Sequence, residues 1–447
     1  MRILWFANVD AAELGPAAAS AGSGGWIGSL LGVLRGRDDV ELFVAAPGRP
    51  GAESQQDGNV IVVPLPTPPV PRGPHGVAAR WDLWADEPVP VETCVAVTGR
   101  VAPDLIHVHG TERSFGLVAT RVGVPAVVSI QGVVEAVARV FLQGVSGAEL
   151  ARDVASLRFL KGGGLVHEWA HMRARVPREQ AVLRGASAIV GRTDFDRDYA
   201  RRVAPRVPYY HCDETLRDPF YAATRADPGA TQATGTQSAD LGGTRPTVLC
   251  VSGSDPYKGI DTLLAATALV RNRGLEIELR VAGPVAGSVR WPAFDRMARD
   301  LDLDGTVTWL GPLPGGEIAV ELERASLAVS PSRMENSPNG LCEAMMVGAP
   351  CVARAVGGIP SLVQHDVTGL LVESDDPGAL AAGMADLLSR PTKAATLGAA
   401  AASVAHERHD RGAIGDRIMA IYASVLERKT PMSAAAIAST APDEAPV

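Results

Sequence analysis

The chain has 447 residues, 46% of them hydrophobic, and its 42 Lys and Arg against 50 Asp and Glu give a net charge of −8 at pH 7. This length exceeds what one hydrophobic core usually organises, so two domains are expected. The acidic balance argues against wholesale binding of nucleic acid, which depends on Lys and Arg that neutralise phosphates. No apolar run approaches the roughly 18 residues that a membrane-spanning helix needs, so no span is expected.

The N-terminal segment MRILWFANVD lacks the basic start, the long apolar centre and the cleavage site of a secretory signal. Five scattered cysteines without a CxxC pair fit a reduced compartment, because a chain of this size does not need disulfide bonds for stability. We therefore expect a cytoplasmic location. The excess of Lys and Arg between Arg152 and Arg202 is expected to be a solvated helix face. The alternative partner for this face is an acceptor or a membrane surface, so that any membrane contact is peripheral.

Short apolar runs in the first half of the chain predict β-strands. Runs of Val, Ile and Leu without alternation are typical of strands covered on both faces, as in a parallel sheet. Right-handed connections are then expected, beginning with a helix at 25–34 after the first strand. The expected strands are 2–8, 41–46, 60–65, 105–110 and 126–132.

A second series of apolar runs predicts a second doubly wound domain. Two parallel-sheet domains that face each other form a cleft, and open α/β sheets bind ligands at the carboxyl ends of their strands. The function is therefore expected in loops that follow strands. The expected strands of this series are 247–253, 277–283, 306–311, 327–332, 350–355 and 369–374.

The domain organisation follows from these patterns. An N-terminal Rossmann-like domain is expected at 1–221 and a C-terminal one at 246–404. Between them, 222–245 consists of Ala, Thr, Gly, Asp and Ser without periodicity and is typical of a flexible linker. A helix at 405–428 can pack back on the N-terminal domain, and the tail at 429–447 offers too little apolar surface to be ordered.

The segment SPSRMENSPNGLCEAMMVGAP at 330–350 is the most informative part of the chain. A strand is expected to end here, followed by a polar loop and by a helix that begins near Asn339. Glu335 and Glu343 are eight residues apart, and both carboxylates are expected to point into the cleft beside exposed amides. The N-terminus of a helix binds anions without a metal ion, through its N–H groups and its dipole.

This string resembles the E-x7-E signature of retaining glycosyltransferases of family four, which have the GT-B fold. Matched segments cover most of 247–385 and include the Gly-Gly-Ile-Pro string and the run at 365–372. The resemblance implies that Glu335 touches the donor sugar and that Glu343 binds the ribose hydroxyls. It also implies that the diphosphate and the sugar are held by the amides of Ser337, Pro338, Asn339, Gly340 and Leu341.

A lysine at a strand-to-helix turn, in VSGSDPYKGIDTLLAA at 251–266, is a second element of the expected site. Family members have a Lys here that contacts the donor diphosphate, so the resemblance implies that Lys258 stabilises the negative leaving group. Many relatives have an Arg five residues earlier, where this chain has Gly253. The leaving group is then balanced by Lys258, by amides and by another Arg, or the donor differs from the common ones.

Two histidines end the strand at 105–110, and alternation places His107 and His109 on the same side. His109 is expected to face the cleft and matches the family's histidine near the reacting sugar, while His107 is expected to be buried support. Gly24 and Gly25 resemble the family's glycine pair near the donor diphosphate and the acceptor, where absent side chains allow close approach.

Three residues in loops of the N-terminal half resemble family-specific contacts on the acceptor side: Glu112, Gln131 and Arg192. Two further patterns are literal matches to metal motifs. The H-E-x-x-H string at 167–171 is set aside because no third ligand follows it in a recognisable arrangement. The D-x-D string at 194–196 is set aside because GT-B enzymes use helix amides and basic residues in place of a metal. No metal and no cofactor are expected.

These observations predict a bacterial, metal-independent, retaining hexosyltransferase. The donor, for which the resemblance implies a UDP-linked sugar, would bind mainly the C-terminal domain. The acceptor would offer a hydroxyl from the N-terminal side, as a small molecule, a lipid-linked glycan or a polysaccharide, in polysaccharide, glycolipid or natural-product synthesis. An epimerase or phosphorylase of the same fold stays open, as does a sugar-binding protein without activity.

Overall fold

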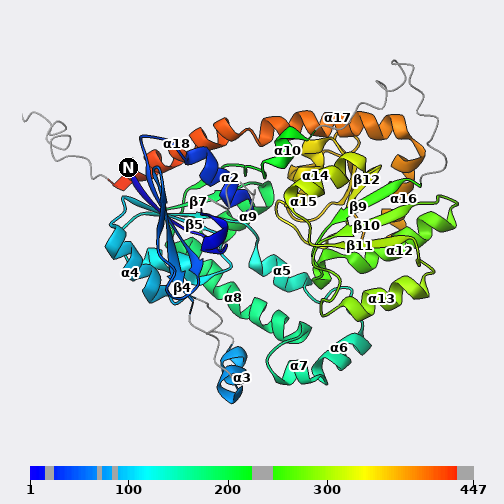
Figure 1. The fold of residues 1–447 in the computed structure, drawn as a ribbon, viewed down its shortest axis with the longest axis horizontal. Coiled ribbons are helices and arrows are strands. Elements are labelled where there is room, and N and C mark those ends of the chain that lie inside the picture. The colour runs from blue at the N-terminus through cyan, green and yellow to red at the C-terminus, as the bar shows by residue number, and fades with distance from the viewer. Residues whose placement is uncertain (16–24, 68–72, 83–88, 224–244, 430–447) are drawn as a thin grey trace, which may run out of the picture.

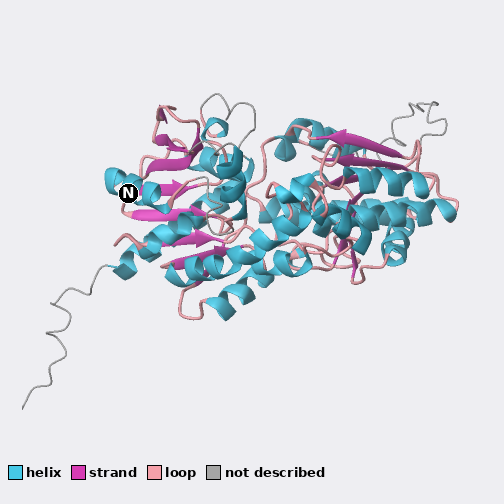
Figure 2. Ribbon diagram, turned by 90° about the horizontal axis from the view of Figure 1, so that it is seen from below, coloured by secondary structure: helices cyan, strands magenta, loops and turns pink. Residues whose placement is uncertain are grey.

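The computed structural model describes residues 1–15, 25–67, 73–82, 89–223 and 245–429. Figure 1 shows two lobes side by side, each built on one sheet, and Figure 2 shows helices packed around each group of strands. The two parallel-sheet α/β domains that the apolar runs predict are therefore present.

Among the described residues, the N-terminal sheet has eight strands in the order β3-β4-β2-β1-β5-β6-β7-β8. Neighbours pair in parallel, except that the edge strand β3 runs antiparallel to β4. The middle of the sheet is buried on both faces, because Ile3 and Trp5 belong to one core cluster and Leu4 and Phe6 to another. The strands are β1 (Arg2–Phe6), β2 (Glu41–Gly48), β3 (Gln55–Asp57), β4 (Val60–Pro66), β5 (Leu105–His109), β6 (Ala126–Ser129), β7 (Ala188–Gly191) and β8 (Tyr209–His211).

Three strands of this sheet are not predicted by the sequence, because β3 and β8 lack an apolar run and that of β7 is short. Strand β3 reads QQD, with both Gln side chains exposed, and β8 reads YYH and is only partly buried. Strand β7 is buried but has only four residues and closely follows a long helix. Short or polar strands are thus recruited by the sheet and not by their own sequence pattern.

The helix expected at 25–34 is present with those bounds. The helices of the N-terminal lobe are η1 (Ala11–Glu13), α2 (Gly25–Leu34), α3 (Gly73–Trp81), α4 (Val91–Val101), η2 (Ser114–Thr120), α5 (Val134–Val140), α6 (Gly147–Val154), α7 (Leu157–Leu160), α8 (Leu165–Gly185), α9 (Asp194–Val203) and α10 (Pro219–Ala222). In Figure 1, α3, α6 and α7 project at the lower edge of the molecule.

The C-terminal sheet has six parallel strands in the order β11-β10-β9-β12-β13-β14, and all six are predicted by the second series of apolar runs. They are β9 (Thr247–Val251), β10 (Glu278–Ala282), β11 (Val307–Gly311), β12 (Leu327–Ser330), β13 (Cys351–Arg354) and β14 (Leu370–Val372). The helices are η3 (Pro256–Lys258), α12 (Ile260–Asn272), α13 (Trp291–Asp300), α14 (Gly315–Arg324), α15 (Asn339–Val347), η4 (Ile359–Ser361), α16 (Pro377–Ser389), α17 (Pro391–Arg408) and α18 (Arg411–Lys429).

The C-terminal helix differs from the single helix expected at 405–428. Helix α17 ends at Arg408, and α18 begins at Arg411 after a break in which the Asp410 carboxylate accepts a hydrogen bond from the Ala413 amide at 2.7 Å. Such a carboxylate caps the start of a new helix. In Figure 1, α17 lies along the C-terminal lobe and α18 along the N-terminal lobe.

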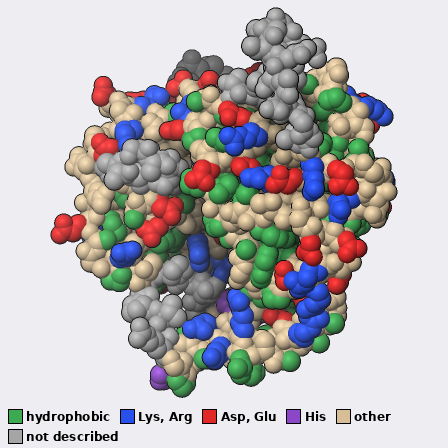
Figure 3. Space-filling view, turned by 45° about the vertical axis from the view of Figure 1, so that its right-hand side comes forward, with side chains coloured by type: hydrophobic (Ala, Val, Ile, Leu, Met, Phe, Trp, Pro, Cys, Tyr) green, Lys and Arg blue, Asp and Glu red, His purple; other side chains and the backbone are tan. Residues whose placement is uncertain are grey.

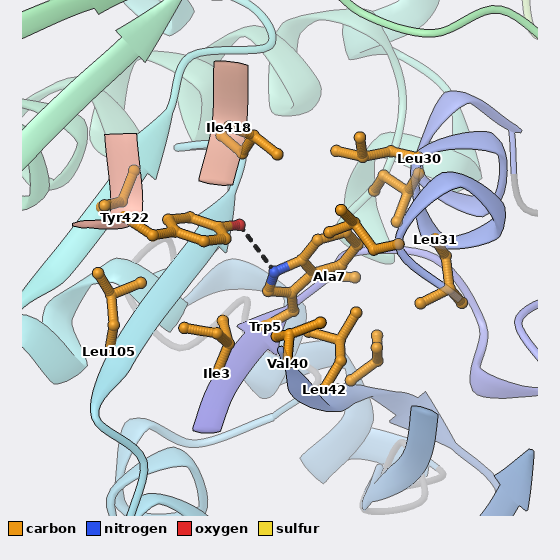
Figure 4. Close-up of a cluster of buried hydrophobic side chains, with 14 of the residues drawn as sticks. Ile3, Trp5, Ala7, Leu30, Leu31, Val40, Leu42, Leu105, Ile418 and Tyr422 are labelled. Atoms are coloured by element: carbon orange, nitrogen blue, oxygen red, sulfur yellow. Dashed lines mark hydrogen bonds between the residues drawn. The ribbon is translucent and has the colours of Figure 1, made fainter. Parts of the chain in front are cut away.

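Helix α18 completes the core of the N-terminal lobe. Its Ile418 and Tyr422 belong to the same buried cluster as Trp5, and the Trp5 indole N–H donates to the Tyr422 hydroxyl at 3.0 Å (Figure 4). Helix α18 is thereby fixed to the first strand. The expected linker and tail lie largely in 224–244 and 430–447, outside the described residues.

Candidate functional site

A cavity of about 560 Å³ is lined by residues of both lobes. Its walls include loops that follow parallel strands of the two sheets, which is where open α/β sheets bind ligands. Most of the site residues predicted from the sequence line this one cavity. They are Gly253, Lys258, Glu335, Ser337, Pro338, Asn339, Gly340 and Leu341 on the C-terminal wall, and Glu112, Gln131 and Arg192 on the N-terminal wall.

Lys258 and Glu335 form an ion pair in the C-terminal wall, with 2.7 Å between Nζ and Oε1. The Ser332 hydroxyl donates to the same carboxylate oxygen at 2.8 Å. Burial alone favours the neutral amine, but the nearby Glu335 carboxylate outweighs it and raises the pKa of Lys258 above its ordinary value. Lys258 is therefore a fixed positive charge in the cavity wall.

The turn that places Lys258 depends on the glycine that follows it. Gly259 has φ +73°, a left-handed conformation that favours glycine, and a Cβ there would lie 2.2 Å from the carbonyl oxygen of Pro331. The loop carrying Glu335 is packed as closely, because a Cβ on Gly357 would lie 1.9 Å from the Glu335 carbonyl oxygen. The Gly358 amide donates to that same oxygen at 3.0 Å. Three glycines thus fix both members of the ion pair.

The N-terminus of α15 contributes to the C-terminal wall, as expected. The set of predicted amide donors is corrected, because Pro338 has no N–H group and the Leu341 amide donates to the Pro338 carbonyl at 3.0 Å. The first-turn amides that remain for a ligand are those of Asn339 and Gly340. Gly340 also packs closely on β9, because a Cβ there would lie 3.1 Å from Cβ of Val251.

Glu343 lies on α15 as predicted, but it does not line the cavity. It is 1% exposed, and its two carboxylate oxygens accept hydrogen bonds from Nε and Nη2 of Arg217 at 2.7 and 2.8 Å. Burial raises the pKa of Glu343 and the Arg217 charge opposes that shift. No sequence pattern indicates Arg217, which lies between β8 and α10 and contacts α15 only in the folded chain.

His109 and His107 lie on the same side of β5, with ring centroids 3.9 Å apart, as strand alternation predicts. His107 is buried support, because its ring nitrogens lie 2.6 Å from the Tyr422 hydroxyl and 2.7 Å from the Ser129 hydroxyl. His109 is 1% exposed and does not line the 560 Å³ cavity. Burial lowers the pKa of His109 well below its usual value, so the ring is neutral.

Two residues separate His109 from the main cavity. The Trp26 ring lies 5.4 Å from the His109 ring, and the Arg192 guanidinium lies over Trp26 at 4.2 Å. His109 lines a second space of about 20 Å³ together with both of them, and neither of its ring nitrogens has a hydrogen-bond partner among the described residues. The expectation that His109 faces the cleft is therefore corrected.

The N-terminal wall has polar atoms without protein partners. Glu112 Oε2 and Gln131 Nε2 are buried and make no hydrogen bond within the part of the chain that the structure describes. Burial raises the pKa of the Glu112 carboxyl group, with a further contribution from the charge of Glu179. Gly25 opens α2 with φ +60° and does not line the cavity, and Gly24 lies outside the described residues.

Glu179, which the sequence does not single out, is a fully buried carboxylate that joins two loops of the N-terminal wall. It accepts hydrogen bonds from the Thr111 hydroxyl at 2.9 Å, the Val134 amide at 2.9 Å and the Tyr199 hydroxyl at 2.5 Å. Burial raises its pKa, and these donors oppose the shift. The loops after β5 and β6, which carry Glu112 and Gln131, are thereby held together.

Buried polar contacts join the two walls of the cavity. The Glu214 carboxylate pairs with Arg192 Nε at 2.8 Å and accepts from the Ser337 hydroxyl at 2.5 Å. Asn336, next to Glu335, accepts from the Thr193 hydroxyl at 2.6 Å and donates to Asp196 Oδ2 at 3.0 Å. These buried links tie the E-x7-E loop to the N-terminal lobe.

The two metal-like patterns have structural explanations. His167 and His171 lie one turn apart on α8, and their Nε2 atoms lie 2.8 and 2.9 Å from the carbonyl oxygen of Arg80. The Asp196 carboxylate accepts from the Arg192 and Thr193 amides, so it caps α9. Within the described ranges, no group of three or more His, Cys, Asp or Glu side chains is arranged to hold a metal ion.

No helix in the described part of the chain is both long and apolar enough to cross a bilayer. Family models match each lobe: a "Glycosyl transferase 4-like domain" over residues 28–209 and "Glycosyl transferases group 1" over residues 245–390. The chain is 32% identical over 187 residues to the D-inositol 3-phosphate glycosyltransferase of Thermobispora bispora, a match that covers 40% of this chain and 44% of that protein. The match thus spans less than half the length of that relative.

Longer similarities point the same way. The D-inositol 3-phosphate glycosyltransferase of Streptomyces scabiei is 26% identical over 349 residues, which cover 74% of this chain and 72% of that protein. Sucrose-phosphate synthase from Thermosynechococcus elongatus has a similar fold, with TM-score 0.71 and 20% identity over 96% of this chain and all of that one. Anabaena HepE in complex with UDP and glucose has TM-score 0.62 and 17% identity over 95% of this chain and all of that one. Because glycosyltransferase models match both lobes and the lobes pair as in these structures, the chain belongs to glycosyltransferase family four and has the GT-B fold.

Proposed function

We propose that this enzyme transfers a hexosyl group from a UDP-linked sugar to a hydroxyl of its acceptor, with retention of configuration and without a metal or a cofactor. The observation that carries the proposal is the Lys258–Glu335 pair, 2.7 Å apart, in the same wall as the N-terminus of α15. A cation and helix amides suit a diphosphate, and a carboxylate suits the hydroxyls of a sugar.

In the proposed step, the acceptor oxygen bonds to the anomeric carbon while the bond from that carbon to the diphosphate breaks. The leaving phosphate accepts the proton of the acceptor on the same face of the sugar. Lys258 and the amides of Asn339 and Gly340 stabilise the charge that develops on the diphosphate. Glu335 accepts hydrogen bonds from the sugar, which therefore competes with Lys258 for that carboxylate.

Glu343 and His109 have less direct places in this proposal. Glu343 would accept the ribose hydroxyls, and because both of its oxygens accept from Arg217, the donor must share or displace that pair. His109 acts as a positioning residue, since it contacts Trp26, which lines the cavity. The acceptor is placed against Glu112 and Gln131, whose partnerless atoms suit hydroxyl groups.

The first experiment measures thermal unfolding with UDP, GDP, ADP or dTDP in the presence of a metal chelator. A nucleotide that binds only the folded state at 100 times its dissociation constant stabilises it by about 2.7 kcal/mol. We expect UDP to stabilise the wild type, and Lys258→Ala to reduce that shift. Lys393→Ala, which removes a half-buried lysine of the same lobe that pairs with Asp366 and Asp386 and does not line the cavity, should keep it.

The choice of UDP rests on structural neighbours such as HepE that bind it. Stabilisation by another nucleotide alone would move the proposal to that donor, and no response in folded protein would refute a nucleotide site. Products formed without an added acceptor are then analysed. An epimerised sugar nucleotide among these products would contradict the proposal of a transferase.

A further inference from the structure

Exposed apolar side chains gather on one projection of the N-terminal lobe. Within the described ranges, nine large hydrophobic side chains are exposed, and four of them lie on α3, α6 and α7. We call residues 73–81 and 147–161 the projection, which lies at the lower edge of Figure 1. Its exposed apolar residues are Leu157 (73%), Leu160 (62%), Val154 (44%) and Trp81 (40%).

The projection is held together by contacts between segments far apart in the sequence. The Trp81 ring meets the Phe159 ring edge-on at 5.1 Å, and the Trp81 indole N–H donates to the Leu160 carbonyl at 3.3 Å. The two histidines of the H-E-x-x-H string also hold α3, through the Arg80 carbonyl. The apolar side chains are thus presented by packed helices.

The inner end of the projection is anchored to the other lobe. Arg290 of the C-terminal lobe is 3% exposed, pairs with Glu149 at 2.9 Å, and donates to the Gly144 carbonyl at 3.1 Å. The projection therefore keeps a fixed position relative to both lobes and can set the orientation of the whole enzyme on a surface.

Charge separates the outer from the inner side of the projection. Both of its acids are partly buried and engaged: Glu149 with Arg290, and Asp153 with the Val166 amide at 3.0 Å. Its four cations, by contrast, are exposed beside the apolar side chains, and hydrophobic and basic side chains lie together at the lower end of Figure 3. These cations are Arg80, Arg152, Arg158 and Lys161.

We propose that the projection binds the surface of an anionic lipid membrane. Leu157 and Leu160 enter the boundary between headgroups and acyl chains, and the exposed cations contact the headgroups. A two-fold dimer through the same face would place its cations against those of the second copy, with the acids turned inward, so self-association is disfavoured. This membrane binding is separate from the proposed sugar transfer, since it needs neither the donor nor the acceptor.

The test is flotation of the full chain with vesicles of phosphatidylcholine alone or mixed equally with phosphatidylglycerol. We expect binding to the mixed vesicles, weaker binding at high salt, and little binding to phosphatidylcholine alone. Three single variants should each lower the partition coefficient about fivefold: Arg152→Gln, Arg158→Gln and Lys161→Gln. The reason is that every cation near an anionic surface adds a similar increment to the binding free energy. Leu157→Glu with Leu160→Glu should abolish binding.

Matched controls are Leu269→Glu and Val404→Glu, which replace exposed apolar side chains elsewhere (38% and 43%) and should leave flotation unchanged. Each variant should unfold at the same temperature as the wild type, which would show that its fold is intact. Equal flotation of the double Leu variant and the controls would overturn the proposal. So would a dimer, seen by sedimentation, that disappears in the double Leu variant. No nucleotide is present, so failure here is distinct from failure of the proposed transfer.

Discussion

The two walls of the cavity are built in different ways. On the C-terminal side the charged groups already have partners, Lys258 with Glu335 in the wall and Glu343 with Arg217 behind it. On the N-terminal side Glu112 Oε2 and Gln131 Nε2 have none among the described residues. A ligand must therefore compete with existing partners on the C-terminal wall, whereas on the N-terminal wall it supplies the missing hydrogen-bond partners.

This difference indicates which wall can contribute more free energy to ligand binding. A pair that is satisfied without ligand gives little net gain when one of its members changes partner, whereas a buried partnerless atom regains its full hydrogen bond. We infer that the C-terminal wall contributes through charge placed before the reaction, and the N-terminal wall through selection of acceptor hydroxyls. The following changes test that contrast, beginning with the largest expected effect.

Lys258→Ala removes the positive charge proposed to stabilise the leaving diphosphate. Loss of one such electrostatic group lowers turnover by about 100- to 1,000-fold. Steady-state kinetics, with the donor that thermal unfolding identifies, measures this fall in turnover. Lys393→Ala is the control for the loss of a lysine. A change in KM alone would mean that Lys258 serves binding and not the transition state.

Arg217→Ala leaves the Glu343 carboxylate buried without its partner. Breaking a buried pair in this way should lower the free energy of unfolding by about 3 kcal/mol, measured by urea denaturation. Arg2→Ala is the matched control, because its pair with Glu41 is 44% and 45% exposed and should cost less than about 1 kcal/mol. Equal effects of the two variants would show that the Arg217 pair is as solvated as the exposed one.

Asn336→Ala removes one of the buried links between the walls, and the link through Glu214 remains. The substitution removes hydrogen bonds to Thr193, Asp196 and the Gln131 carbonyl, and leaves the buried Asp196 carboxylate with one donor fewer. We expect a loss of about 2 kcal/mol in stability. Because Asn336 adjoins Glu335, turnover should also fall while donor affinity measured by calorimetry stays near wild type. Unchanged turnover in folded protein would remove Asn336 from the positioning of Glu335.

The sequence predicts the C-terminal wall better than the N-terminal one for a physical reason. The loop at 330–350 places Glu335 and the first turn of α15 in the wall by local geometry, so a contiguous string describes them. The position of His109 depends instead on Trp26 and Arg192, which come from different loops and cover its ring. A local sequence pattern cannot predict such contacts between residues of different loops.

The same limit explains the fold features that the sequence misses. Strands β3 and β8 exist because a neighbouring strand offers hydrogen bonds, and their own residues are polar or partly exposed. Arg217 and Glu179 act through partners 126 and at least 20 positions away, and only the tertiary structure brings those together. Apolar runs, by contrast, predict all six strands of the C-terminal sheet.

The smallest expected effect tests the N-terminal wall through pH. Because burial raises the pKa of Glu112 above the ordinary 4.5, the folded state holds this proton at pH values where the unfolded state has lost it. Stability from this group is present below pH 4.5 and declines as the pH rises toward the folded pKa. Glu112→Gln removes this decline, so its free energy of unfolding relative to wild type should rise between pH 4.5 and pH 8, as urea denaturation at each pH would measure. A constant difference across that range would mean that the Glu112 carboxylate is solvated, and the contrast between the two walls would then rest on Gln131 alone.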